Sequence, residues 1–330
     1  MARQLASTDL ARAQAWVDSL PSGRVKDRAV QGILKELQNA APQTGAAFLD
    51  QVGLDNKNSH LASGTALAWF DRDQDAALAW IESQNNPQIA QQLTHDVIAH
   101  WSLQDPAAAV AHAARIDDPE SQSRALQSCM ANWASINPQE AIAHYATLGE
   151  SDSPAIVTSM INSMAFADID AATDLLESSL NTYDDTLSLS TLASSADHLV
   201  NTWSRFDAAA AAEWSNTLSQ PEARKRAIQR AATEWIEQDS LAASEWIGDL
   251  PAGPGRDGSV SELVRHIRHE DPSTAFAWAN SIGDERSRTS ELRTILNQWK
   301  TTDPNAAAQA LQSADVSTDA YNSIARELAN

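Results

Sequence analysis

The chain has few of the residues that build covalent and phosphate-binding sites. Its single cysteine, Cys129, excludes an internal disulfide and a metal site made of several cysteines. Its 11 glycines form no Gly-rich phosphate loop, and the sequence contains no HExxH or GxSxG motif. We therefore predict that the protein is not an enzyme and needs no cofactor.

Long hydrophobic runs and positive charge are also scarce. No run of 18 or more apolar residues is present, so we expect no membrane insertion. Against 44 Asp and Glu stand only 23 Lys and Arg, a net charge of −21, which disfavours nucleic acid as a partner. The N-terminal segment lacks an apolar stretch of signal-peptide length. A cytoplasmic location and export with removal of a signal peptide both stay open.

The chain is dominated by one recurring pattern, which Trp133 to Glu150 show most fully. It consists of an aromatic ring, a short polar gap, Asp or Asn before proline, an alanine, a second ring and a leucine. The Asp or Asn position, or its equivalent, is an anchor that recurs at Asp9, Ala41, Asp73, Asp105, Asn137, Asp170, Asp207, Asp239, Asp271 and Asp303. Seven of the nine steps between anchors are 32 residues, and the two irregular steps are 33 and 37. Such regularity indicates a repeat protein.

The anchor residues predict where helices begin. Asp and Asn accept hydrogen bonds from the free amides of a first helical turn, and proline is tolerated directly after them. Apolar residues follow at helical spacing, then a Gly or Pro break, then a second amphipathic stretch. Each unit is thus expected to be a hairpin of two helices that buries its apolar faces only by stacking on its neighbours. We predict an all-α solenoid of about ten such repeats in one domain, residues 1–330.

The tryptophans occupy two positions of the repeat. The first set lies four residues before an anchor and the second seven after it: Trp69, Trp101, Trp133, Trp203, Trp235 and Trp299, then Trp16, Trp80, Trp214, Trp246 and Trp278. Both positions belong to the apolar stripes, so we expect these rings to be large core residues. The alternative is a groove lined by rings that binds a sugar or a peptide.

The repeat unit resembles the tetratricopeptide repeat in its proline, in the aromatic residue six positions later and in the leucine after that. The resemblance covers the whole chain, although the unit has 32 residues rather than 34, and the usual glycine and tyrosine of the first helix are mostly missing. It implies a right-handed superhelix that binds other proteins. That family has no catalytic residues that would correspond to positions here.

Three residues depart from the pattern where most repeats carry Trp or Phe. His112, His144 and Glu177 occupy that position in three successive repeats. Two imidazoles and a carboxylate are plausible ligands of zinc or nickel, which makes a metal-dependent enzyme one alternative function. The interpretation we favour is that each side chain makes local contacts, because successive repeats set them too far apart to share a metal ion.

Charge is unevenly distributed along the chain. An acidic block runs from Glu150 to Glu213 with only Arg205 opposing it, and we expect a longer loop there at Tyr183, Asp184 and Asp185. Basic residues gather later, beginning with Arg224, Lys225 and Arg226. These two clusters are candidate interaction sites and would orient a neighbouring copy of the chain.

The last segment retains an apolar stripe that includes Tyr321, Ile324 and Leu328. We expect this stripe to be uncapped, either because the array continues in a longer protein or because copies join end to end into a filament. The predicted function is accordingly a scaffold for protein or peptide binding, with filament formation as the alternative.

Overall fold

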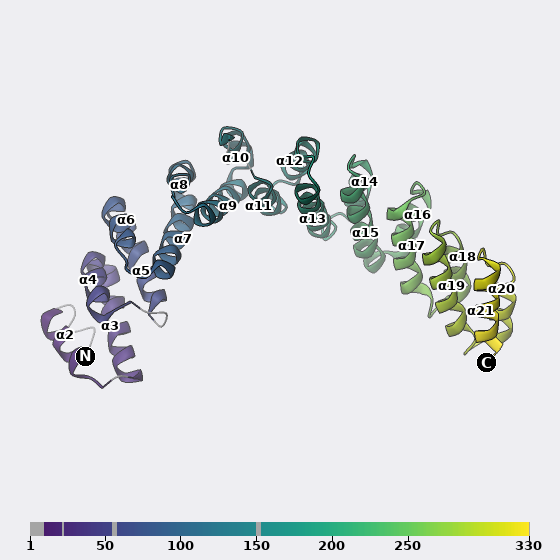
Figure 1. The fold of residues 1–330 in the computed structure, drawn as a ribbon, viewed down its shortest axis with the longest axis horizontal. Coiled ribbons are helices and arrows are strands. Elements are labelled where there is room, and N and C mark those ends of the chain that lie inside the picture. The colour runs from purple at the N-terminus through teal and green to yellow at the C-terminus, as the bar shows by residue number, and fades with distance from the viewer. Residues whose placement is uncertain (1–9, 22, 55–57, 150–152, 330) are drawn as a thin grey trace. The chain divides into compact units, whose positions relative to one another are not determined.

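The computed structural model describes residues 10–21, 23–54, 58–149 and 153–329. These residues form helices, turns and irregular connections, and no strand occurs among them. The prediction of an all-α protein is confirmed (Figure 1). Among the helices of this part of the chain, none combines the length and the apolar character that crossing a membrane requires.

Helix contacts divide the chain into two units, residues 1–133 and 134–330, which meet within helix α9. The helices of the first unit are α2 (Leu10–Ser19), α3 (Arg24–Ala40), α4 (Pro42–Val52), α5 (Ser59–Phe70), α6 (Gln74–Glu82), α7 (Pro87–Gln104), α8 (Pro106–Ala113) and α9 (Pro119–Ile136). Even-numbered helices are the first helices of the predicted hairpins, and odd-numbered helices are the second.

The helices of the second unit continue this alternation. They are α10 (Pro138–Tyr145), α11 (Pro154–Met164), α12 (Ile169–Thr182), α13 (Thr186–Trp203), α14 (Ala208–Thr217), α15 (Pro221–Gln238), α16 (Ser240–Asp249), α17 (Pro254–Ile267), α18 (Pro272–Asn280), α19 (Glu285–Trp299), α20 (Pro304–Leu311) and α21 (Thr318–Ala329). Within this unit the second helices pack on one another in order from α11 to α21, and the first helices form a separate layer (Figure 1).

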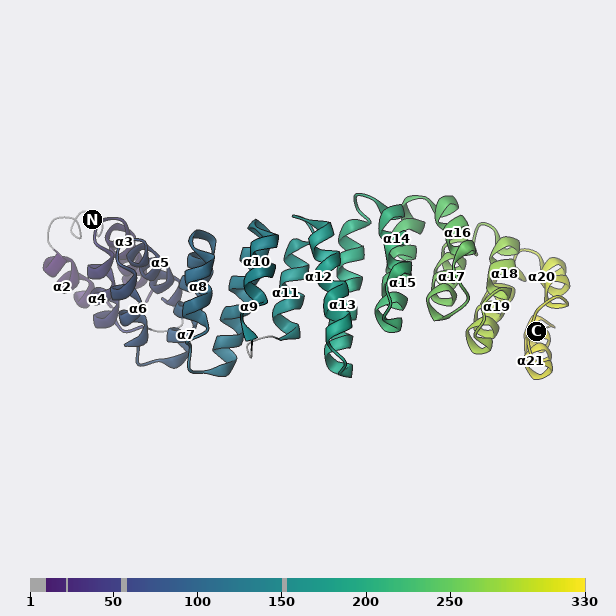
Figure 2. The same ribbon diagram turned by 90° about the horizontal axis from the view of Figure 1, so that it is seen from above.

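The hairpins of the second unit stand side by side, as Figure 2 shows. Because each hairpin reverses the chain, the turns that lead into first helices share one edge of the unit, and the turns inside the hairpins share the other. In Figure 2 the turns leading into α14, α16 and α18 lie along the upper edge.

Anchor aspartates cap the first helices as the sequence predicts. The carboxylate of Asp239, for example, accepts a hydrogen bond of 3.0 Å from the amide of Ala242. The same contact is made by Asp73, Asp105, Asp207, Asp271 and Asp303. Ala41 and Asn137 precede their helices without a side-chain cap, and the amide of Asn137 donates to Glu140 instead. Asp9 lies outside the described residues.

One predicted anchor is wrong. The residue that caps α12 is Asp168, which accepts from the amide of Ala171 at 3.0 Å, and Asp170 lies inside the first turn. Chain spacing alone could not separate two aspartates two residues apart. The extra residues of this irregular repeat also do not form a long loop, since only Tyr183, Asp184 and Asp185 separate α12 from α13. They lengthen α12 to 14 residues instead.

The fully buried core is mostly aliphatic. In the second unit it includes Ile247, Leu263 and Ile295, with alanines such as Ala243 and Ala275 at the close approaches of helices. Only Trp80 and Trp133 are buried among the tryptophans, and the other nine are partly exposed. The prediction that the rings form the core is therefore correct only for these two. The others are only partly buried, and several form tilted ring pairs, for instance Trp203 with Trp214 and Trp235 with Trp246.

The two aspartates before and inside α12 give a test of the cap assignment. We expect Asp168→Ala to destabilise α12 by about 1 kcal/mol, because the amide of Ala171 loses its acceptor. The matched variant Asp170→Ala should change stability by no more than a few tenths of a kcal/mol, an amount typical of a charge near a helix terminus. Hydrogen exchange of the α12 amides, together with urea unfolding, measures both. Equal effects of the two substitutions would contradict the assignment.

Candidate functional site

The three residues considered as metal ligands have separate local roles. Among the described residues, no group of three or more His, Cys, Asp or Glu side chains is placed to hold a metal ion. His112 packs its ring against Trp101, with 5.5 Å between ring centroids. Glu177 accepts a hydrogen bond of 2.9 Å from the indole of Trp214. His144 is partly buried near the end of α10.

The assignment of Glu177 to the ring position also changes with the new cap. Counted from Asp168, Glu177 lies nine residues after its anchor, and Leu175 takes the ring position. Asp50 lies nine residues after Ala41 and accepts from the indole of Trp80, at 3.1 and 3.2 Å to its two oxygens. A carboxylate at this position thus binds the ring of the following repeat in both units.

His112 and Glu82 occupy the corresponding ring and carboxylate positions of the next pair of repeats, and Glu82 acts on His112 through its charge. Glu82 lies nine residues after Asp73, and His112 seven residues after Asp105, the same relation as Asp50 and Trp80. Burial lowers the pKa of His112 below its usual value of 6.5, the charge of Arg115 lowers it further, and Glu82 opposes the shift. His112 is therefore a core-margin histidine that resists protonation.

The acidic and tyrosine cluster at the start of α13 is partly structural. Asp185 caps α13, and hydrogen bonds from Ser188 lower the pKa of its carboxyl group. The hydroxyl of Tyr183 lies 3.3 Å from that of Tyr145 on α10. Asp184 is exposed.

The basic cluster on α15 is largely paired within the chain. Glu222 binds Arg226 at 3.0 Å and Lys225 at 3.5 Å, and Arg226 also donates to Ser194 on α13. One turn further on, Arg230 binds Asp197 of α13 at 3.0 Å. Acidic and basic residues that are distant in sequence therefore meet between neighbouring helices, and Arg224 is partly exposed beside them.

The three residues of the final helix differ in their exposure. Ile324 is fully buried, and Leu328 is partly buried against the same core cluster. Tyr321 keeps 36% of its surface exposed. The expectation that Ile324 serves as an interaction residue is wrong, because α19 and α20 pack on α21 and cover it.

Two adjoining grooves lie on the face made by the first helices of the second unit. One, about 410 Å³, is lined by Gly248, Arg256, Ser273, Thr274, Ala277, Trp278 and Ser281. The other, about 870 Å³, is lined by Ser273, Phe276, Ala277, Asn280, Trp299, Ala306, Gln309, Ala310, Gln312 and Ser313. Ser273 and Ala277 border both grooves, so α18 is a low ridge between them. The repeat pattern did not indicate these groove-lining residues. The small side chains at exposed positions of α18 are the sequence signal that could have identified them.

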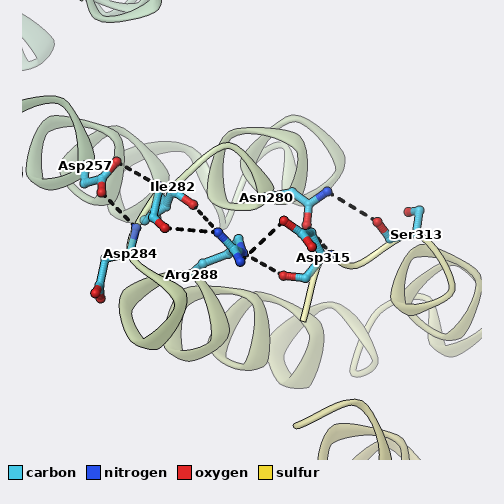
Figure 3. Close-up of polar contacts among 8 residues, drawn as sticks. Asp257, Asn280, Ile282, Asp284, Arg288, Ser313 and Asp315 are labelled. Atoms are coloured by element: carbon cyan, nitrogen blue, oxygen red, sulfur yellow. Dashed lines mark hydrogen bonds and ion pairs between the residues drawn. The ribbon is translucent and has the colours of Figure 1, made fainter. Parts of the chain in front are cut away.

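A polar network fixes the ends of these grooves (Figure 3). Arg288, whose side chain is only 14% exposed, donates to the carbonyls of Ile282 and Asp315, at 2.6 Å each. Asn280 accepts from the amide of Asp315 at 2.7 Å and donates to the carbonyl of Ser313 at 3.3 Å. Asn280 and Ser313 line the larger groove. Its wall is therefore held by hydrogen bonds between successive hairpins.

A third groove lies in the first unit, between the N-terminal halves of α7 and α9. Its volume is about 570 Å³, and its polar lining includes Gln88, Gln91, Gln92, His95, Asp118, Ser121 and Arg124. Within this lining, the carboxylate of Asp118 accepts a hydrogen bond of 2.9 Å from the backbone amide of Ser121. The groove offers hydrogen-bond donors and acceptors for a polar ligand.

No protein-family model matches the chain, and a search of curated proteins finds no match either.

The lone thiol gives a test of chemical reactivity. Burial raises the pKa of Cys129 to about 12, so almost none of it is thiolate near neutral pH. We expect the folded chain to resist iodoacetamide at about pH 8, where an ordinary cysteine reacts, and to be labelled once urea unfolds it. Mass spectrometry measures both states. Rapid labelling of the folded chain would contradict the burial of Cys129.

Replacing His112 tests the contact between ring and carboxylate. Folding lowers the pKa of His112, so its titration has no effect on stability well above its usual pKa of 6.5. As the pH falls below that value, the unfolded chain binds the proton more readily than the folded chain, and the folded state is progressively destabilised. We expect His112→Trp to remove this loss and to add about 1 kcal/mol through an indole hydrogen bond to Glu82. Urea unfolding at acidic and alkaline pH measures it.

His112→Phe is the matched control. It removes the titration without supplying an N–H, so it should lose the pH dependence and gain nothing from Glu82. Adding Glu82→Gln should weaken the Trp variant more than the Phe variant. A Trp variant that is less stable than the native chain at every pH would show that the position cannot accept the larger ring.

Proposed function

We propose that this chain is a right-handed α-solenoid of about ten two-helix repeats, similar to tetratricopeptide proteins, that binds another protein or a peptide without catalysing a reaction. The observation that carries the proposal is the pair of adjoining grooves on α16, α18 and α20. They are open, they share a wall, and they are lined by small and amide side chains with Trp278 and Trp299.

The chemistry of the lining supports a peptide ligand. Partly exposed tryptophans supply apolar contact area, and the exposed amides of Gln309 and Gln312 supply donors and acceptors for a peptide backbone. Apart from Arg256, the lining of these grooves contains no charged residue. A ligand held there would be recognised by shape and hydrogen bonds more than by charge.

The fixed wall also supports binding. Arg256 donates to the carbonyl of Ser281 at 3.0 Å, and Arg288 joins the next turn, so both groove ends are braced before any ligand arrives. A surface that is already ordered loses less conformational entropy on binding. Repeat proteins commonly use such extended surfaces for partners.

Filling the ridge between the grooves tests the proposal. Ala277 is exposed and borders both grooves, so Ala277→Arg should obstruct them without disturbing the core. Peptides selected from a displayed random library on the native chain should bind this variant at least about tenfold more weakly, since the lost contact area is worth more than 1.4 kcal/mol. Fluorescence anisotropy measures the affinity.

The matched control is Ala111→Arg. Ala111 is an exposed alanine at the same repeat position on α8, outside these grooves. It should leave binding unchanged. Selected peptides that bind both variants equally well would place the binding surface elsewhere. Concentration-dependent growth of fibres by the native chain, seen by light scattering, would favour the filament alternative.

A further inference from the structure

The second unit exposes large apolar side chains along one edge. Phe166, Phe206 and Leu241 are 67%, 77% and 71% exposed. They lie within two residues of the caps Asp168, Asp207 and Asp239, in or next to the turns that lead into α12, α14 and α16. These turns share one edge of the unit because each hairpin reverses the chain, and those leading into α14 and α16 can be seen along the upper edge in Figure 2. By contrast, the other three phenylalanines are buried, with exposed fractions of 1% for Phe48, 1% for Phe70 and 7% for Phe276.

Carboxylate residues lie within four positions in sequence of each of these side chains. The three cap aspartates hold one oxygen each on a backbone amide, at 2.9 to 3.0 Å, so their charges are fixed at the turns. Asp170 and Glu237 are exposed beside them. Arg205 is the one basic side chain in the turns that carry these residues. We call the surface made of these three apolar and five acidic residues the acidic edge.

Several of the chain's nearby cations are held away from this edge, whereas Arg205 is an exposed cation at the edge itself. The basic residues of α15, α17 and α19 nearest in sequence are held by internal contacts, such as Arg230 to Asp197 and Arg288 to Asp315. Arg226 and Arg256 also donate to serines within the unit. One exposed arginine among five carboxylates leaves the acidic edge with an excess of negative charge, which a cationic group of another molecule would complement.

We propose that the acidic edge docks a cationic amphipathic helix of a partner protein. The apolar face of such a helix would cover Phe166, Phe206 and Leu241, and its Lys or Arg side chains would pair with the flanking carboxylates. The edge extends over two repeat steps, roughly 20 Å at the usual spacing of packed helices, which is about 13 residues of α-helix. This surface is separate from the grooves on α16, α18 and α20, and it stands independently of the function proposed for them.

A designed peptide tests this surface without knowledge of the natural partner. The probe is a fluorescent leucine and lysine peptide of about 14 residues, with leucines spaced to give one helical face. Its control is the same peptide with glutamate in place of lysine. We expect the native chain to bind the lysine peptide at least tenfold more tightly than the glutamate peptide, and less tightly as salt is raised, because exposed charges are screened.

Substitutions at exposed positions separate the two contributions. Phe166→Gln, Phe206→Gln and Leu241→Gln together should weaken binding at least tenfold. Asp170→Asn with Glu237→Gln, which leaves all caps in place, should weaken it several-fold and reduce its salt dependence. Leu187→Gln is the matched control, since Leu187 is 79% exposed at the opposite edge, where α13 begins.

The outcomes that overturn the proposal are distinct. Equal binding of lysine and glutamate peptides would remove the charge argument. Unchanged binding by the triple glutamine variant, or an equal loss on Leu187→Gln, would show that the acidic edge is not the docking surface. If the triple variant instead abolishes self-association of the chain, this edge is an interface between copies. Circular dichroism confirms that each variant is folded, and Ala277→Arg should leave this binding unaffected.

Discussion

The structure depends on the inability of any one hairpin to bury its own apolar face. A first helix of eight to ten residues, such as α8 or α16, is too short to be stable alone in water. It becomes stable only when the second helix of its hairpin and the neighbouring hairpins cover its apolar stripe. Side chains at the contacts between hairpins are consequently constrained most strongly, and side chains on the free faces are constrained least.

This constraint explains where polar residues recur. A carboxylate nine residues after a cap lies opposite the ring of the following repeat, and Asp50 with Trp80 and Glu177 with Trp214 use it alike. The indole N–H would otherwise be left against the margin of the core, where an unmet donor is costly. Salt bridges such as Arg230 with Asp197 connect second helices in the same way. Some of the chain's charged residues therefore hold neighbouring hairpins in register.

The sequence predicts the helices well because their signals are local. Caps at a spacing of 32 residues, prolines at first helical positions and apolar stripes each act within one or two turns. It fails where two local signals compete, as with Asp168 and Asp170, because both residues are good caps and only packing decides between them. The predicted loop near Tyr183 is wrong for a related reason. The extra residues continue the apolar stripe of α12 and so extend the helix.

Exposure is the property that the repeat pattern predicts least. Most tryptophans lie on the apolar stripe, yet they lie at its margin, because alanine and aliphatic residues fill the close approaches and leave no room for a large ring. Among the described residues, no third metal-ligating side chain is grouped with His112 and His144. Spacing in sequence places a residue on a helix face, whereas a shared metal ion requires side chains to converge.

The candidate surfaces follow from the same division between constrained and free positions. On the solvent-facing side of α18, core packing does not fix the size of Ser273 and Ala277. Both side chains are small, and the grooves beside them remain open. Stability does not explain Phe206 either, because a ring that is 77% exposed contributes little to the core and carries a solubility cost. A glycine or serine would serve that turn equally well. Exposed rings at two of these turns, with Asp170 and Glu237 nearby in sequence and capping no helix, fit a surface that contacts another molecule better than they fit a role in stability.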